Sequence, residues 1–301
     1  MLEWKVALSA SLCLFGATAA LAQMADSLDD IVPAGAACER VVTGLQFTEG
    51  PAWDGKGSLF FSDIPANRIY KLDEAGKLEV FLEPSGKSNG LIFDANGDLL
   101  AGRHDARDVA RITMQGNVTV LAGSYDGKKL NSPNDLVRAK DGSLYFTDPN
   151  YGLEGRPQEQ PVEGVYRLAP DGKVTRIADD MTRPNGILLS PDGEALYVAD
   201  TQARKIRAYT VQADGTATGG RDFAAVPSGG ADGMAMDMQG NIYCTCGAGI
   251  GVYTPEGRLL GAIAVPEKPA NCTFGGADWR TLYITAQRSV YRIRLTIAGL
   301  R

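Results

Sequence analysis

The sequence predicts an all-β protein, folded as a six-bladed β-propeller with four antiparallel strands per blade. Two observations predict this fold: one segment pattern occurs six times, and short apolar strands without an amphipathic helical period fill the stretches between the copies. The chain has 301 residues, of which 44% are hydrophobic, so it can bury the core of one large domain. We place the propeller domain at residues 38–297.

Each copy of the repeated segment follows a turn, continues with alternating apolar residues and often ends in Asp. The third residues of the copies are spaced by 40, 45, 52, 46 and 40 positions; they are Leu59, Leu99, Leu144, Leu196, Ile242 and Leu282. An earlier strand and two later strands, such as residues 67–73 and 78–82, complete most units. Four short strands in a unit of this length are typical of a propeller blade.

The sixth unit ends after its third strand, at residues 289–295. A ring left open at this point would expose unpaired strand edges. We therefore expect the segment Glu39–Thr43 to supply the missing outer strand, so that the two ends of the domain share one blade.

Residues 1–22 are typical of a secretory signal peptide. A charged start precedes an apolar run at residues 7–21, which is too short to span a bilayer and ends in a small-residue cleavage site. We expect an exported protein, periplasmic or secreted, with no membrane association after cleavage. A membrane anchor that is never cut is the alternative.

The net charge of -6 and the absence of a basic cluster argue against a nucleic-acid partner. A propeller of this size is expected to be a monomer. The cysteines that follow the signal peptide leave the disulfide pairing open, and their spacing does not favour a zinc site; they are Cys38, Cys244, Cys246 and Cys272.

One oxygen-bearing side chain stands at the same position of every blade. It precedes the apolar residue of the repeat by ten positions, or by eleven in blades 4 and 6, and the set is Glu49, Asn89, Asn134, Asn185, Asp232 and Asn271. Because the first strand of a propeller blade lines the central channel, we expect these six "ring residues" to converge on its axis. Carboxylates and amides without thiolate or imidazole favour a hard cation, Ca²⁺ more than Mg²⁺.

Ordinary turn chemistry is the alternative explanation for the ring residues, since Asn-Gly and Asp-Gly pairs are common in turns. Glu49 does not fit this explanation, because Glu is a poor turn residue. The shared register together with Glu49 favours a metal site.

Five motifs carry a resemblance to a known family; they are residues 47–53, 132–136, 147–152, 183–187 and 230–234. Together they resemble the gluconolactonase and regucalcin family of six-bladed propellers, also called the senescence-marker-protein family. The resemblance covers about residues 38–295 and implies hydrolysis of a sugar lactone, a small-molecule substrate, with one bound divalent metal. That metal is often Ca²⁺, with Zn²⁺, Mg²⁺ or Mn²⁺ as alternatives.

The resemblance also implies roles for single residues. Glu49, Asn185 and Asp232 would bind the metal, and Asn134 would complete the metal shell or hold substrate. Ser132 stands where the animal members of the family carry an Arg, so the sugar-acid preference of that branch is not implied.

In the chemistry that we expect, the metal polarises the lactone carbonyl and Asp232 deprotonates the attacking water. Direct attack by the Asp232 carboxylate is the alternative. We expect the sole histidine, His104, together with Tyr151 and Asn89, to contact the substrate, although a structural role is an alternative for each. No Gly-x-Ser-x-Gly elbow is present, which argues against a serine esterase.

The aspartates that end three of the repeats are interpreted as turn or blade-packing residues; they are Asp63, Asp148 and Asp200. Two other functions remain open on this fold. One is a phosphotriesterase or another esterase-like hydrolase that uses the same site, and the other is a binding propeller whose metal is structural.

Overall fold

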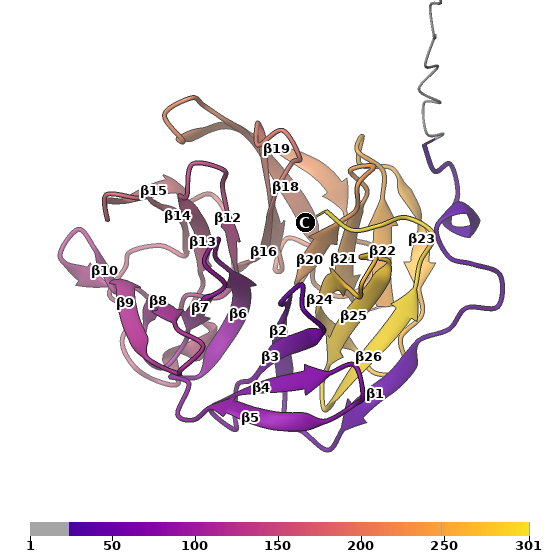
Figure 1. Cartoon of the computed structure of the whole chain (residues 1–301). Helices are drawn as coiled ribbons and strands as arrows, with labels where there is room; N and C mark the ends of the chain where they lie inside the picture. The colour runs from indigo at the N-terminus through magenta and orange to yellow at the C-terminus, as the bar shows by residue number, and fades with distance from the viewer. Residues whose placement is uncertain (1–23, 248, 301) are drawn as a thin grey trace, which may run out of the picture.

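The strands of the computed structural model form six four-stranded antiparallel sheets around a central axis, which confirms the six-bladed propeller (Figure 1). The structure describes residues 24–247 and 249–300. The predicted signal peptide, residues 1–22, lies outside the described residues. In the described part, no helix is both long enough and apolar enough to cross a membrane.

The first three blades run outward from the channel in chain order: β2 (Thr48–Trp53), β3 (Ser58–Asp63), β4 (Arg68–Asp73) and β5 (Leu78–Leu82); β6 (Ser88–Phe93), β7 (Leu99–Arg103), β8 (Asp108–Ile112) and β9 (Val118–Ala122); β12 (Leu136–Arg138), β13 (Leu144–Asp148), β14 (Gly164–Leu168) and β15 (Val174–Ala178). A short hairpin, β10 (Ser124–Tyr125) and β11 (Lys128–Lys129), joins blades 2 and 3. A single 3₁₀ turn, η2 (Tyr151–Leu153), lies in the loop after β13.

The other three blades follow the same order: β16 (Pro184–Leu189), β17 (Ala195–Asp200), β18 (Lys205–Val211) and β19 (Ala217–Ala225); β20 (Met234–Met236), β21 (Ile242–Cys246), β22 (Gly249–Tyr253) and β23 (Leu259–Ile263); β24 (Pro269–Gly275), β25 (Thr281–Ala286) and β26 (Ser289–Arg294). The innermost strands β2, β6, β12, β16, β20 and β24 each contact the innermost strands of both neighbouring blades, so they form a closed ring.

Apolar side chains fill the space between neighbouring sheets. Phe60 of blade 1 meets Phe93 of blade 2 edge to face, with 5.4 Å between the ring centroids, and Leu99 is fully buried in the same cluster. This packing follows from the apolar alternation of the repeat, which places one side chain in two on each face of a sheet. The cysteines of the described chain, Cys38 and three buried ones, are all unpaired thiols.

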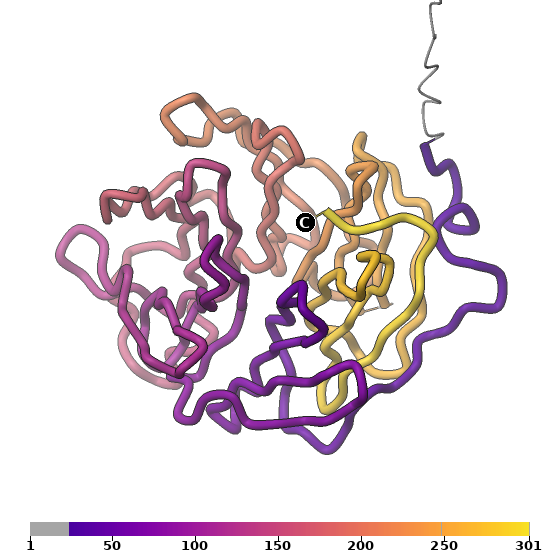
Figure 2. Tube along the Cα trace, in the orientation of Figure 1, coloured from indigo at the N-terminus to yellow at the C-terminus, as the bar shows by residue number. Residues whose placement is uncertain are grey.

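Blade 6 is completed by β1 (Glu39–Thr43), which pairs antiparallel with β26. The register places Arg40 opposite Tyr291 and Thr43 opposite Ser289. In Figures 1 and 2 the indigo N-terminal segment therefore runs beside the yellow C-terminal strands. The predicted closure of the ring by residues 39–43 is confirmed.

Closure by β1 can be tested with two shortened proteins, one that begins at residue 24 and one that begins at residue 44. We expect the first to unfold cooperatively, because it retains every described residue. The second loses the partner of β26 and also Ile31, which is fully buried in the core of blades 5 and 6, so we expect a lower Tm or aggregation. Equal Tm values in thermal unfolding would contradict this account of ring closure.

Candidate active site

The six ring residues lie together at the end of the channel where the innermost strands begin. Five of them are only 3–5% exposed and Asp232 is half-buried. The pairing of the first and second strands shifts register beside Glu49, Asn89, Asn185 and Asn271. Such bulges re-aim side chains, and they are frequent next to active sites.

Neighbouring blades approach each other very closely at the ring residues. A Cβ atom added to Gly50 would lie 1.9 Å from the carbonyl oxygen of Asn89, and one added to Gly233 would lie 2.0 Å from Cγ of Asn271. These glycines are therefore required by contact between blades. The Glu49-Gly50 pair is part of the inner strand β2, and the Asp232-Gly233 pair directly precedes β20, so neither pair forms an ordinary turn.

Hydroxyl groups of the second strands tie neighbouring blades together at the same level. Ser62 Oγ donates to the carbonyl oxygen of Asn89 at 2.8 Å, and Thr147 Oγ1 donates to that of Asn185 at 2.8 Å. Both hydroxyls are fully buried. Sequence reasoning missed them, although a Ser or Thr directly before the last residue of the repeat is their signal.

The aspartates that end second strands hold the loops that lead into the ring. Asp148 accepts hydrogen bonds from the backbone N–H groups of Asn131 and Ser132, each at 2.8 Å, directly before a ring position. Asp63 and Asp200 bind backbone N–H groups of their own blades in the same way. Their interpretation as packing residues is confirmed, and it now includes positioning of the ring.

Three ring amides have a buried side-chain oxygen with no hydrogen-bond partner among the described atoms: Asn89, Asn134 and Asn185. The amide nitrogen of Asn185 donates to Thr201 Oγ1 at 3.3 Å, and that of Asn89 lies 3.2 Å from Nε2 of His104. These contacts involve the amide nitrogens and leave the oxygens without a partner. A buried acceptor without a partner is costly, and a cation is one way to satisfy it.

Carboxylates gather at the same place. Burial raises the pKa of Glu49 well above its usual value, and the negative charge of Asp232 raises it further. Burial also raises the pKa of Asp232 to about 7, opposed by the charge of Lys268, and that of Asp135 to about 6. None of the three carboxylates makes an ion pair within the described part of the chain.

The donor set fits a hard cation. Within residues 24–247 and 249–300, no three His, Cys, Asp or Glu side chains lie close enough together to hold a metal by themselves. A cation at this position would therefore depend on amide oxygens as well as on Glu49 and Asp232. Mixed carboxylate and amide oxygens are typical of Ca²⁺ sites.

His104 and Tyr151, the two predicted substrate-binding residues outside the ring, lie beside it. Burial lowers the pKa of His104 to about 4, so the imidazole is neutral near pH 7. Because Nε2 accepts from Asn89, the proton is on Nδ1. The hydroxyl of Tyr151 is buried, and the guanidinium carbon of Arg183 lies 5.4 Å from the centre of its ring.

A cavity of about 780 Å³ lies in the channel on the other side of the ring. It reaches Asp135 and Asn271 at its inner end and the hairpin turns that end the inner strands, such as residues 138–141 and 190–193, at its outer end. The ring residues therefore separate this cavity from the end of the channel where the inner strands begin.

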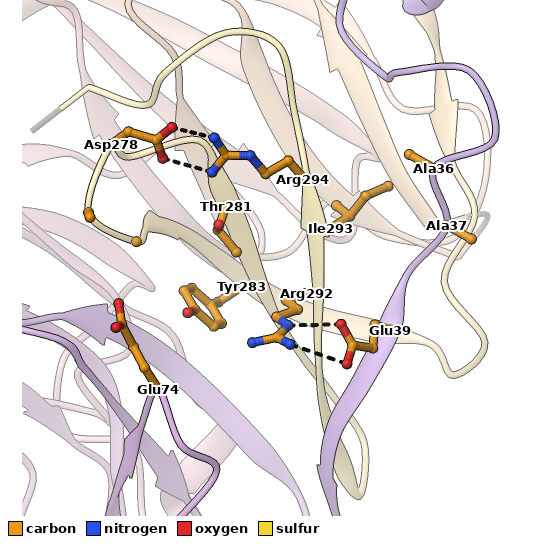
Figure 3. A pocket seen from close by; sticks show the side chains of 12 residues that line it. Ala36, Ala37, Glu39, Glu74, Asp278, Thr281, Tyr283, Arg292, Ile293 and Arg294 are labelled. Atoms are coloured by element: carbon orange, nitrogen blue, oxygen red, sulfur yellow. Dashed lines mark hydrogen bonds and ion pairs between the residues drawn. The ribbon is translucent and has the colours of Figure 1, made fainter.

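A second cavity, of about 790 Å³, lies at the edge of the propeller between blades 6 and 1 (Figure 3). Two ion pairs line it, Arg292 with Glu39 and Arg294 with Asp278, so these charges are already compensated (Figure 3). None of the predicted site residues lines this cavity. The channel is therefore the better candidate for the active site.

Fold and site together define a six-bladed propeller with an oxygen-rich polar centre. The chain belongs to the family described as the SMP-30/Gluconolactonase/LRE-like region, whose model matches residues 47–288. This confirms the resemblance seen in the sequence motifs.

Among its relatives, a gluconolactonase of Zymomonas mobilis is 35% identical, over 90% of this chain and 85% of that protein. A pentonolactonase of Haloferax volcanii is 31% identical, over 82% of this chain and 84% of that one. The solved gluconolactonase of Xanthomonas campestris is 35% identical and superposes with a TM-score of 0.84, covering 89% of this chain and 92% of that structure.

The positioning role of Asp148 predicts a large loss of stability in Asp148→Ala. The substitution leaves two buried N–H groups unpaired, which costs about 1–3 kcal/mol for each group. Asp171→Ala is the matched control in the same blade, because Asp171 is exposed and accepts one turn N–H. Urea unfolding measures both variants, and equal losses would refute the role.

The environment of His104 predicts that the only imidazole of the chain stays neutral from pH 8 down to about pH 5. Proton NMR can follow this single histidine, with the protein unfolded in urea as the control that titrates near its ordinary pKa. Because the folded pKa is lowered, the unfolded chain binds the proton first, so this group lowers stability as the pH falls below about 6.5. A folded-state midpoint near 6.5 would contradict the buried position.

Proposed function

We propose that this protein is a metal-dependent hydrolase of sugar lactones. The observation that carries the proposal is the cluster of ring residues, which combines unpartnered amide oxygens with the carboxylates of Glu49 and Asp232, neither of which has an ion pair among the described residues. The relatives named as lactonases, two of them at 35% identity over most of the chain, support the same reaction class.

Glu49, Asn185 and Asp232 would hold the metal, and Asn134 would complete the donor set. We propose Ca²⁺ because the donors are all oxygens, two of them carboxylates and the others amides. When bound, such a cation supplies Lewis acidity, which polarises a lactone carbonyl and stabilises the oxyanion that forms from it.

Asp232 is the ring carboxylate best placed to move a proton, because it is partly exposed whereas the other five ring residues are buried. Its pKa, raised to about 7 by burial, makes it a stronger base than an ordinary carboxylate. In the proposed reaction it takes a proton from water while the water oxygen bonds to the lactone carbonyl carbon. The bond between that carbon and the ring oxygen then breaks, and the ring oxygen leaves as a hydroxyl after it regains the proton.

The buried pair of His104 and Asn89 has a different role in this proposal. A neutral imidazole with a pKa near 4 is too weak a base to compete with Asp232. It accepts from the amide nitrogen of Asn89 and so turns the amide oxygen toward the substrate.

Removal of the metal and of Asp232 tests the proposal. We expect chelator to abolish hydrolysis of glucono-δ-lactone, Ca²⁺ to restore it, and Asp232→Ala to lower kcat by about 10²–10⁴-fold with the fold intact. Asp171→Asn, on the exposed turn of blade 3, is the control and should keep wild-type activity. The assay follows acid release at constant pH, corrected for spontaneous hydrolysis.

Two results would contradict the proposal. Wild-type rates in Asp232→Ala or in fully chelated protein would refute the assigned site. A metal-loaded protein that cleaves an organophosphate but no sugar lactone would refute the reaction class.

A further inference from the structure

The loop after β13 holds Tyr151 rigidly beside the ring residues. Ser132 Oγ donates to the carbonyl oxygen of Pro149 at 2.6 Å and accepts from the N–H of Gly152 at 2.9 Å. The guanidinium of Arg156 donates to the carbonyl oxygens of Gly152 at 2.7 Å and of Asp105, in blade 2, at 2.8 Å. These hydrogen bonds hold the loop that carries Tyr151 against Ser132 and against blade 2.

The ring of Tyr151 lies near the predicted metal-binding side chains. Burial raises the pKa of the Tyr151 phenol, and the negative charge of Asp232 adds to this shift. Gly152, the next residue in the chain, packs directly against His104, whose Nε2 lies 3.2 Å from the amide nitrogen of Asn89. Asn185 is connected to the backbone beside Asp232 through Thr201. Its amide nitrogen donates to Thr201 Oγ1, and this hydroxyl donates at 2.7 Å to the carbonyl oxygen of Ala231, the residue before Asp232.

Arg183 lies against Tyr151 from the neighbouring blade. It stands two residues before Asn185, in a backbone conformation with φ of 60°, and its N–H donates to Glu163 Oε2 at 2.7 Å. Its side chain is exposed, and its guanidinium carbon lies 5.4 Å from the centre of the Tyr151 ring. Within the described residues, this guanidinium makes neither an ion pair nor a hydrogen bond.

A guanidinium that lies over an aromatic ring keeps its N–H groups available, because the attraction between cation and ring does not require them as hydrogen-bond donors. Five donors held in a fixed fork beside an aromatic face match a polyhydroxylated ring. The aromatic face packs on the C–H groups of such a ring, and the fork binds its hydroxyl oxygens.

We propose that Arg183, which lies over the ring of Tyr151, determines specificity by donating hydrogen bonds to the hydroxyl groups of the lactone ring. The inference rests on the proposed lactone hydrolysis and names the part of the substrate that this side of the site recognises. Arg183 acts on substrate binding, and Asp232 on the chemical step.

The test compares two substrates with the same six-membered ester ring, glucono-δ-lactone and δ-valerolactone, which has no hydroxyl groups. For Arg183→Gln we expect kcat/KM on gluconolactone to fall about 10- to 100-fold, mainly through KM, because lost hydrogen bonds to a substrate are costly. The value on δ-valerolactone should stay within about twofold of wild type. Arg183→Lys keeps the charge but not the fork, so it should recover only part of the loss.

Arg221→Gln is the matched control, because Arg221 is also exposed in blade 4 and lies 6.0 Å from the ring centre of Phe223 on the outer strand. The Arg221→Gln substitution should leave kcat/KM unchanged on both lactones.

Equal losses of Arg183→Gln on both lactones would mean that Arg183 only supports the fold, and no loss on either would also overturn the inference. If wild-type protein hydrolyses neither lactone, the proposed function itself fails, so the two failures are distinguishable.

Discussion

The close approach of the six inner strands is the constraint on which the rest of this structure depends. At Gly50 and Gly233 the neighbouring blade leaves no room for a Cβ atom, so the strands can meet only because the side chain is absent. The buried hydroxyls of Ser62 and Thr147 hold the blades at this spacing. Side chains as distant in sequence as Glu49 and Asn271 therefore meet at one point, although no α-helix or disulfide of residues 24–247 and 249–300 brings them together.

This approach also creates the electrostatic conflict at the centre. Buried charges are normally paired, and buried amide oxygens normally have a donor. Here Glu49, Asp135 and Asp232 raise the free energy of one another's ionised forms, while the oxygens of Asn134 and Asn185 have no partner among the described atoms. Proteins break such local rules mainly at functional sites, and the proposed cation would remove both conflicts at once.

The periodic part of this molecule could be predicted from the sequence. The spacing of Leu59 and its counterparts gave six blades, the incomplete last unit gave the closing strand β1, and the shared register gave six side chains that do lie together. A repeat reveals such features because each blade packs against its neighbours with the same pattern of residues.

Contacts between blades could not be predicted in this way, because they depend on how bulges turn the chain. The sequence around Glu49 does not show why a glycine follows it, and only the position of the Asn89 carbonyl oxygen, 1.9 Å from where a Cβ atom of residue 50 would lie, gives the cause. The contact between Tyr151 and Arg183 joins a loop of blade 3 to blade 4, and no spacing rule links these two positions.

The structure also explains why Ser132 suits its position. The Ser132 hydroxyl is fully buried and bridges Pro149 and Gly152, which anchors the loop that carries Tyr151. If Arg183 binds the hydroxyl groups of the substrate as proposed, the cationic group of the site comes from blade 4, next to the blade that carries Tyr151. Catalysis by the ring residues and recognition of the sugar would then depend on different parts of the structure. The ring residues are positioned by backbone contacts between blades, whereas recognition depends on one loop and one exposed side chain.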